Sequence, residues 1–229
     1  MTWRSRAAAN NAEWCDMVCR SHGLEGRFDD DAWTCPTRTP VFYPDAVTLV
    51  PRPSVPALLA RIDSGPGCSV KDSFATLDLS DHGFGVLFDA HWVVCTDAER
   101  EPETTVPPWE VVQKADLLAS WEEARDEGPS GIFRAELLAH DAVAVLCARR
   151  EERVTAGAVL QRSPTVVGIS NFFTTDGAVD AAWSGCITLA NSLFPGSTFV
   201  GYESGDALDV VRRHGFEPAG ALRVWIRPD

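Results

Sequence analysis

The sequence contains no uninterrupted apolar stretch near the length of about 20 residues that a membrane-spanning helix needs. It also lacks an excess of positive charge, because 20 lysines and arginines face 33 aspartates and glutamates, for a formal net charge of −13. Both absences argue against a membrane or a nucleic acid as the default partner. An anionic ligand would therefore need a focused site, built from backbone N–H groups and a few arginines.

The amino-terminal residues 1–20 lack the continuous apolar core of a signal peptide, and acidic residues follow two early arginines. The seven cysteines also lack the dense spacing of a disulfide framework. This pattern is typical of free thiols in a reducing compartment, and we therefore expect a cytoplasmic protein.

One group of cysteines has a spacing that a metal could use. Cys15, Cys19 and His22 lie at positions i, i+4 and i+7 of an expected helix, and Cys35 could supply a fourth zinc ligand. The sequence has no C-x-x-C pair, however, and cysteine is among the residues most often buried in a core. We favour the core interpretation and predict no metal.

The composition is that of a folded globular protein, since 45% of the 229 residues are hydrophobic and 23% are charged. The segment 96–108 is rich in acidic residues, threonine and proline and has no apolar periodicity. We predict that it links an amino-terminal half, residues 1–95, to a carboxy-terminal half, residues 109–229.

The apolar periodicity predicts an α/β protein with a mixed sheet. In the amino-terminal half we expect two helices and three strands, namely a helix over 7–21, a strand over 46–50, a helix after Ser54 and strands over 69–79 and 83–94. In the carboxy-terminal half we expect helices from about Trp109 and Ile132, strands over 142–150, 153–163 and 165–173, a helix over 177–194, a strand over 197–204, a helix over 205–215 and a final strand pair that turns at Pro218–Gly220.

The segment 203–220, ESGDALDVVRRHGFEPAG, resembles the last helix and β-turn of the GNAT superfamily of N-acetyltransferases. Ala207, Gly215 and Phe216 match the family pattern there and Arg213 is a conservative replacement, whereas Ser204 and Val211 replace the family's asparagine and tyrosine. The order of elements over 143–227 is also similar to the GNAT core. For the amino-terminal half the resemblance suggests a degenerate GNAT-like copy, because His82-Gly83-Phe84 echoes His214-Gly215-Phe216; chance is the alternative.

This resemblance implies a sheet whose fourth and fifth strands, here over 165–173 and 197–204, part like a V. The parted strands would receive the pantetheine arm of acetyl-CoA or another acyl-CoA, and the following helix would face the pyrophosphate with its amino terminus. The residues that the resemblance places at the cofactor are Asn171, Phe172, Phe173, Thr174, Gly177, Ala178 and Arg213. Only one glycine of the family's loop is present, and Asp176 and Asp180 add negative charge.

Acyl transfer to an amine needs a general base, and Glu203 near the end of the fifth strand is the best candidate. Tyr202 or Ser204 could supply the proton donor that the family takes from its helix tyrosine. The alternative is that Glu203 only caps the following helix or solvates the strand end. Cys186 could carry an acyl group, although a buried helix cysteine is usually inert packing.

The resulting hypothesis is an acyl-CoA-dependent N-acyltransferase that acts on a small amine or a peptide amine. The sequence leaves open a GNAT-fold pseudoenzyme that binds a ligand or a protein, and a GNAT-fold enzyme of other acyl-thioester chemistry. The oligomeric state is not indicated.

Overall fold

The computed structural model describes residues 1–96, 108–126 and 128–228. Its contacts divide the chain into two units, each of which is described by itself. Unit 1 comprises Met1–Val93, Tyr202–Ser204 and Pro218–Asp229, and unit 2 comprises Val94–Gly201 and Gly205–Glu217. Most of the expected linker, residues 97–107, lies outside the described residues, so the domain boundary at 96–108 stays a prediction.

The expected mixed α/β class is confirmed. Within the described residues, the strands follow the hydrogen-bonded order β1-β2-β3-β4-β11-β5-β10-β9-β8-β7-β6, with both parallel and antiparallel pairs. None of the described helices has the length and apolar content of a membrane span. The strands are β1 (Arg27–Phe28), β2 (Ala32–Thr34), β3 (Ala46–Thr48), β4 (Ser69–Asp72), β5 (Gly85–Cys95), β6 (Trp109–Val111), β7 (Val143–Arg150), β8 (Arg153–Arg162), β9 (Val167–Thr174), β10 (Phe199–Glu203) and β11 (Glu217–Ile226).

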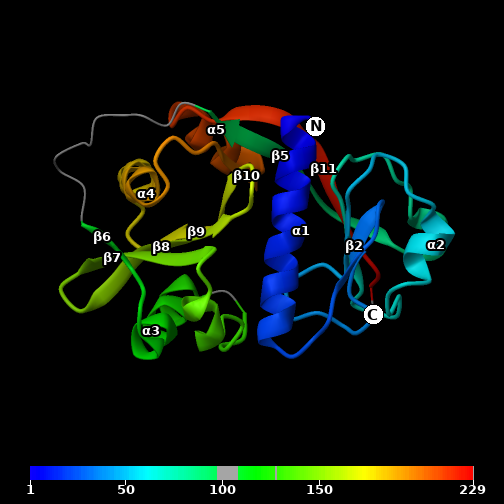
Figure 1. The fold of residues 1–229 in the computed structure, drawn as a ribbon, viewed down its shortest axis with the longest axis horizontal. Helices are drawn as coiled ribbons and strands as arrows, with labels where there is room; N and C mark the ends of the chain where they lie inside the picture. The colour runs from blue at the N-terminus through cyan, green and yellow to red at the C-terminus, as the bar shows by residue number, and fades with distance from the viewer. Residues whose placement is uncertain (97–107, 127, 229) are drawn as a thin grey trace. The chain divides into compact units, whose positions relative to one another are not determined.

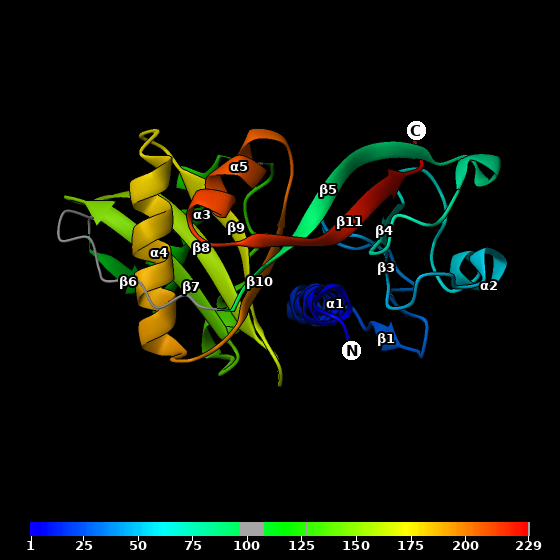
Figure 2. The ribbon, with the colours of Figure 1, turned by 90° about the horizontal axis from the view of Figure 1, so that it is seen from above.

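In unit 1, two helices cover opposite faces of the short strands. Helix α1 (Trp3–Ser21) lies on one face and α2 (Val55–Leu59) on the other, as Figure 2 shows. The alternation of β-strand side chains explains this arrangement. Val70 packs in the same core as Leu58 of α2, whereas the next residue, Lys71, reaches Asn11 of α1.

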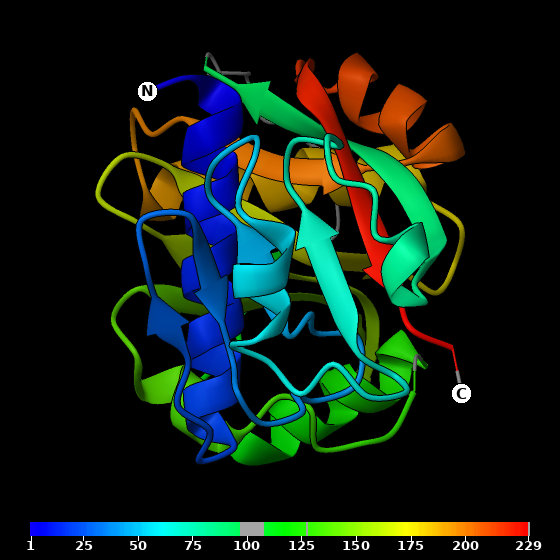
Figure 3. The ribbon, with the colours of Figure 1, turned by 90° about the vertical axis from the view of Figure 1, so that its right-hand side faces the viewer.

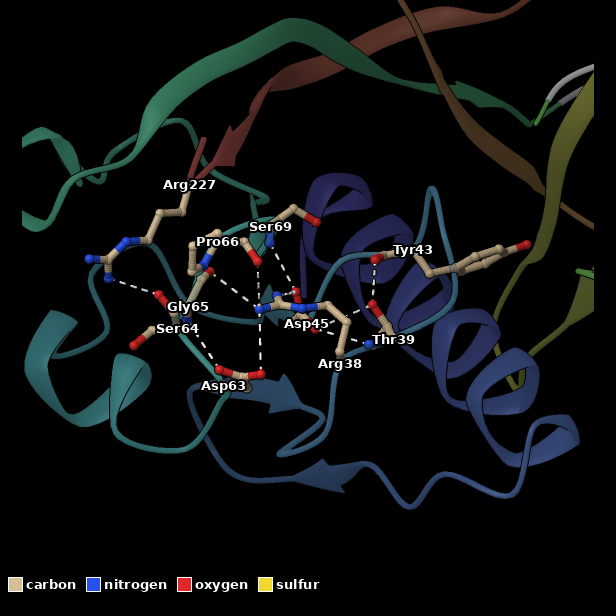
Figure 4. Close-up of polar contacts among 10 residues, drawn as sticks. All are labelled: Arg38, Thr39, Tyr43, Asp45, Asp63, Ser64, Gly65, Pro66, Ser69 and Arg227. Carbon is tan, nitrogen blue, oxygen red and sulfur yellow. Dashed lines mark hydrogen bonds and ion pairs between the residues drawn. The ribbon is translucent and has the colours of Figure 1, made fainter. Parts of the chain in front are cut away.

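A buried carboxylate connects the loops at one end of unit 1. The Asp45 side chain is 1% exposed and accepts hydrogen bonds from Arg38 Nη1 at 2.7 Å, from the Thr39 N–H at 3.1 Å and from the Ser69 N–H at 2.9 Å (Figure 4). An ionised carboxylate loses its hydration on burial, so these donors replace the lost water. This network has a structural function, because its donors come from the segments that it joins.

The last strand of the chain belongs to unit 1, where β11 pairs with β4 in antiparallel orientation and lies beside β5 (Figure 3). Trp225 of β11 is 4% exposed in the unit 1 core. The expected separate amino-terminal half is therefore not evident. The expected turn at Pro218–Gly220 is also wrong, because β11 runs unbroken through it; Gly220 adopts φ 141° in the strand, a value that glycine permits.

In unit 2, helices α3 (Ala115–Arg125) and α4 (Val179–Leu193) cover opposite faces of the sheet (Figure 1), and α5 (Gly205–Arg213) follows β10. Strands β7 and β8 form a hairpin with Glu151-Glu152 at its turn, as expected. The helix expected from Trp109 begins only at Ala115.

Two expectations for the start of unit 2 are wrong in detail. Residues Trp109–Val111 form the strand β6 against β7, because an antiparallel neighbour with free backbone groups outweighs weak local propensity over three residues. The helix expected from Ile132 is a single 3₁₀ segment, Ala135–Ala139.

Gly157 on β8 provides a test of this packing. A Cβ at this position would overlap the indole nitrogen of Trp121 and the ring of Phe173. We expect Gly157→Ala to lower the free energy of unfolding by about 1–3 kcal/mol, because a well-packed core does not accept the extra methyl group. Urea denaturation measures the change.

Gly85→Ala is the matched control, because a Cβ at this strand glycine meets nothing within 4 Å. Its stability should stay the same or rise by at most about 1 kcal/mol. Equal losses in the two variants would contradict the packing around Gly157.

Candidate functional site

The pairing between the parallel strands β9 and β10 is short. Its register contains two residue pairs, Phe199 with Val167 and Val200 with Gly168. Within the described residues, β9 continues to Thr174 and β10 to Glu203 without a further pair between them. Backbone groups of β9 beyond Gly168 are therefore not paired with β10, and unpaired strand groups can bind an extended ligand.

On its other side, β9 carries a bulge in its pairing with β8. Ser170 pairs with Val159 and Phe173 with Gly157, so two residues of β9 oppose one of β8. Asn171 lies in this bulge with φ 52°, and its Nδ2 donates to Ser170 Oγ at 3.0 Å. A bulge frees backbone groups and redirects side chains. Asn171, a predicted cofactor residue, thus lies where β9 loses regular pairing on one side.

The two phenylalanines predicted to contact the cofactor hold β9 between the helices of unit 2. The Phe172 ring stacks on Trp183 of α4 at 4.2 Å, and the Phe173 ring packs edge-on against Trp121 of α3 at 5.2 Å. Successive strand residues point to opposite faces, which is why they reach different helices. Both residues are half-buried and pack against a helix, and their contact with a cofactor stays a prediction.

The loop between β9 and α4 is exposed and turns at Gly177, whose φ of 74° favours glycine. The Asp176 carboxylate accepts the Ala178 N–H at 3.0 Å and the Thr174 hydroxyl at 2.9 Å, and these bonds lower the pKa of Asp176. The Val179 N–H donates to the Gly177 carbonyl. The N–H groups of Ala178 and Val179 are therefore already hydrogen-bonded within the loop and are not free to bind a phosphate.

The negative charge of the second acidic residue of this region, Asp180, is balanced by basic neighbours. Asp180 pairs with Arg213 Nη2 at 3.0 Å and lies 3.1 Å from His214 Nε2. The hydrogen bond from Arg213 holds the pKa of Asp180 below its usual value. Arg213 is one of the residues predicted to contact the cofactor. Its guanidinium group is instead paired with Asp180, which lies in the first turn of α4.

The end of β10 carries the predicted catalytic residues Tyr202, Glu203 and Ser204. Glu203 is partly buried, and burial raises the pKa of its carboxyl group to about 7. Within the described residues, its carboxylate has no hydrogen-bond or ion-pair partner. A carboxyl group with a pKa near neutrality can accept a proton at physiological pH, as a general base must. Ser204 is exposed and directly precedes α5.

Tyr202 has neighbours that the sequence did not indicate. Its ring lies 4.2 Å from Lys71 Nζ and packs edge-on against Trp92 at 5.6 Å. Lys71 is 4% exposed and comes from β4, far from Tyr202 in the sequence. In the sequence, its one signal is that the chain has two lysines and that one of them, Lys71, falls within an expected strand.

Other predicted residues do not form a site. Cys186 is fully buried and its thiol has a pKa raised to about 12, so it is not a nucleophile. Val211, at the position of the family tyrosine, is buried at 1% exposure. Cys15, Cys19 and Cys35 are buried thiols, and no group of three metal-ligating side chains occurs in the part of the chain that the structure describes.

No family model and no curated protein matches the sequence. Solved structures are similar to it. A GCN5-related N-acetyltransferase from Kribbella flavida has a TM-score of 0.71 at 17% identity, over 100% of this chain and 97% of that chain. A conserved protein of unknown function from Staphylococcus epidermidis has a TM-score of 0.61 at 11% identity, over 89% of this chain and 93% of that chain. A GNAT-family acetyltransferase from Novosphingobium aromaticivorans has a TM-score of 0.56 at 12% identity, over 97% and 99%. The chain therefore has the GNAT fold over its whole length.

Asp176 supplies a test of the loop. Asp176→Asn removes a negative charge near the amino terminus of α4 and keeps an oxygen that can accept the Ala178 N–H. If the loop binds the phosphates of coenzyme A, we expect the dissociation constant to fall about two- to fivefold at low salt and less in high salt. Isothermal titration calorimetry measures it.

Asp116→Asn makes the same charge change in the first turn of α3 and is the matched control. It should leave the affinity unchanged. Equal effects of the two substitutions would assign the change to net charge rather than to the loop.

Proposed function

We propose that the chain is an acyl-CoA-dependent N-acyltransferase that acts on a small amine or a peptide amine. The observation that carries the proposal is the short β9–β10 pairing in a chain with the GNAT fold. The similar protein from Kribbella flavida is called an N-acetyltransferase, and we extend that activity to this chain as part of the proposal.

Unit 2 contains the residues that would hold the cofactor. The unpaired backbone of β9 around Asn171 would bind an amide-containing arm by strand addition, and the bulge would direct an N–H group at a carbonyl oxygen. Thr174, Gly177 and Ala178 would lie near the diphosphate. An acyl-CoA supplies an activated acyl group, and the chain's own residues supply orientation and proton transfer.

Glu203 would remove a proton from the acceptor amine, directly or through a water molecule. Tyr202 would donate a proton to the leaving thiolate, with Ser204 as the second candidate. Tyr202 and Glu203 are successive residues of β10, so their side chains leave the strand on opposite faces.

A second candidate function is binding without acyl transfer. Two amides of the loop are occupied by Asp176 and by the Gly177 carbonyl, and Val211 cannot donate a proton. Such a protein would bind an acyl-CoA or another ligand and release it unchanged. Other acyl-thioester chemistry is distinguished by turnover of the thioester without an amine.

The proposal includes a duplication. In unit 1, β3 and β4 are a parallel pair joined by α2, and β5 follows His82-Gly83-Phe84. In the carboxy-terminal part, β9 and β10 are a parallel pair joined by α4, and β11 follows His214-Gly215-Phe216. This repeated order supports a degenerate GNAT-like copy at the amino terminus.

The pH profile tests the role of Glu203. A general base works in its deprotonated form, so kcat/KM should rise with pH through about 7 and level off above it. Glu203→Gln should lower kcat by about 10²–10⁴-fold and leave the affinity for acetyl-CoA nearly unchanged. Unchanged turnover would remove Glu203 from this role.

Stability provides a separate test of the buried carboxyl group. Its pKa is higher in the folded protein than its ordinary value of 4.5, so stability should fall as pH rises from about 4.5 to 7 and stay low above that. Glu203→Gln should remove this loss and raise the free energy of unfolding at pH 8 by up to about 3 kcal/mol, with little effect at pH 4. Urea denaturation of both proteins at the two pH values measures these changes. An equal change in the free energy of unfolding at both pH values would contradict the raised pKa of Glu203.

Calorimetric titration with acetyl-CoA and with free coenzyme A separates the two functions. A transferase binds acetyl-CoA and releases thiol when an amine is present, whereas a binding module binds it without thiol release. Absence of binding of both compounds in the folded protein would overturn the transferase and would leave a binding module for a different ligand.

A further inference from the structure

Tyr202 belongs to a cluster in unit 1 whose members lie far apart in the sequence. Lys71 Nζ donates to Asn11 Oδ1 at 2.8 Å and lies 4.2 Å from the centre of the Tyr202 ring. Trp92 packs edge-on against the same ring, and its Nε1 donates to the Ser73 carbonyl at 2.8 Å. The cluster therefore joins α1, β4, β5 and β10 around one aromatic ring.

The electrostatic situation of Lys71 is unusual. The side chain is 4% exposed, yet within the described residues no carboxylate forms an ion pair with it. Burying an ammonium group without a counter-ion is costly. Its stabilising contacts are the amide oxygen of Asn11 and the electron-rich face of Tyr202. The chain has two lysines, Lys71 and the exposed Lys114, so this buried one is a specific feature.

The Tyr202 ring has two packing partners, whereas its hydroxyl has no hydrogen-bond partner among the described residues. The ammonium and the Trp92 indole restrict the ring. Tyr202 is half-buried, and its hydroxyl is not among the buried polar atoms of the described residues that lack a partner. A fixed ring with an available hydroxyl is what a group that acts on a ligand requires.

We propose that Lys71, held by Asn11, is a positioning residue that orients Tyr202 for its part in the reaction. The inference rests on the proposed function, because Tyr202 is the candidate proton donor to the leaving thiolate. Lys71 does not touch the reacting atoms; it acts through the ring that it contacts. A misplaced donor loses rate rather than cofactor affinity.

Kinetics of a double-mutant cycle test the proposal. Lys71→Met keeps the aliphatic stem and removes the charge, and we expect kcat to fall roughly 10- to 100-fold with KM for acetyl-CoA changed less than about twofold. Lys71→Arg restores a cation that can face the ring and should recover much of kcat. In a Tyr202→Phe background, Lys71→Met should have no further effect.

A purely structural role of Lys71 would give additive losses in the cycle and would overturn the proposal. Lys114→Met, at the exposed lysine, controls for the loss of one positive charge and should leave kcat unchanged. Thermal melting of each variant separates unfolding from a catalytic loss, and Lys71→Arg keeps the test usable if Lys71→Met does not fold.

A spectroscopic readout works even if the protein has no transferase activity. The chain contains two tyrosines, Tyr43 and Tyr202, so protein with ring-¹³C-labelled tyrosine gives separable signals that Tyr202→Phe assigns. We expect Lys71→Met to shift the Tyr202 signal and leave the Tyr43 signal in place. An unmoved Tyr202 signal would overturn the inference, whereas a shifted signal in a protein without thiol release would contradict the proposed function alone.

Discussion

The short pairing between β9 and β10 is the constraint on which the rest of unit 2 depends. A parallel pair needs a crossover, and α4 supplies it. Because the ladder ends after Val200, the continuing part of β9 must be held by other contacts. Trp121 and Trp183 hold it from two faces through Phe173 and Phe172. The part of β9 that is not paired with β10 is thereby packed between two helices.

The positions of Asp176 and Asp180 in the structure change what their negative charges imply for the binding of an anionic ligand. In the sequence, Asp176 and Asp180 both argue against an anionic ligand. In the structure, Asp180 is neutralised by Arg213, whereas Asp176 occupies the Ala178 amide. The objection to phosphate binding is therefore reduced to one exposed carboxylate, that of Asp176, whose hydrogen bonds are local.

The end of β10 places two adjacent residues in different environments. Burial raises the pKa of the Glu203 carboxyl group to about 7. The Tyr202 ring instead contacts Lys71 and Trp92. The first effect comes from burial without a polar partner and the second from a charged and an aromatic neighbour, which is why adjacent residues of one strand can have distinct properties.

The sequence determined the elements whose periodicity is long, such as α4 and the β7–β8 hairpin, and its motif around Gly215-Phe216 indicated the fold and the residues at the end of β10. Short elements such as β6 were decided by tertiary pairing, since three residues carry too little periodicity to outweigh a neighbouring strand. The partners of Tyr202 could not be predicted for a different reason, which is their distance along the chain. Lys71 and Asn11 are far from it in the chain, and only the pairing of β4 with β11 and the packing of α1 bring unit 1 together around that ring.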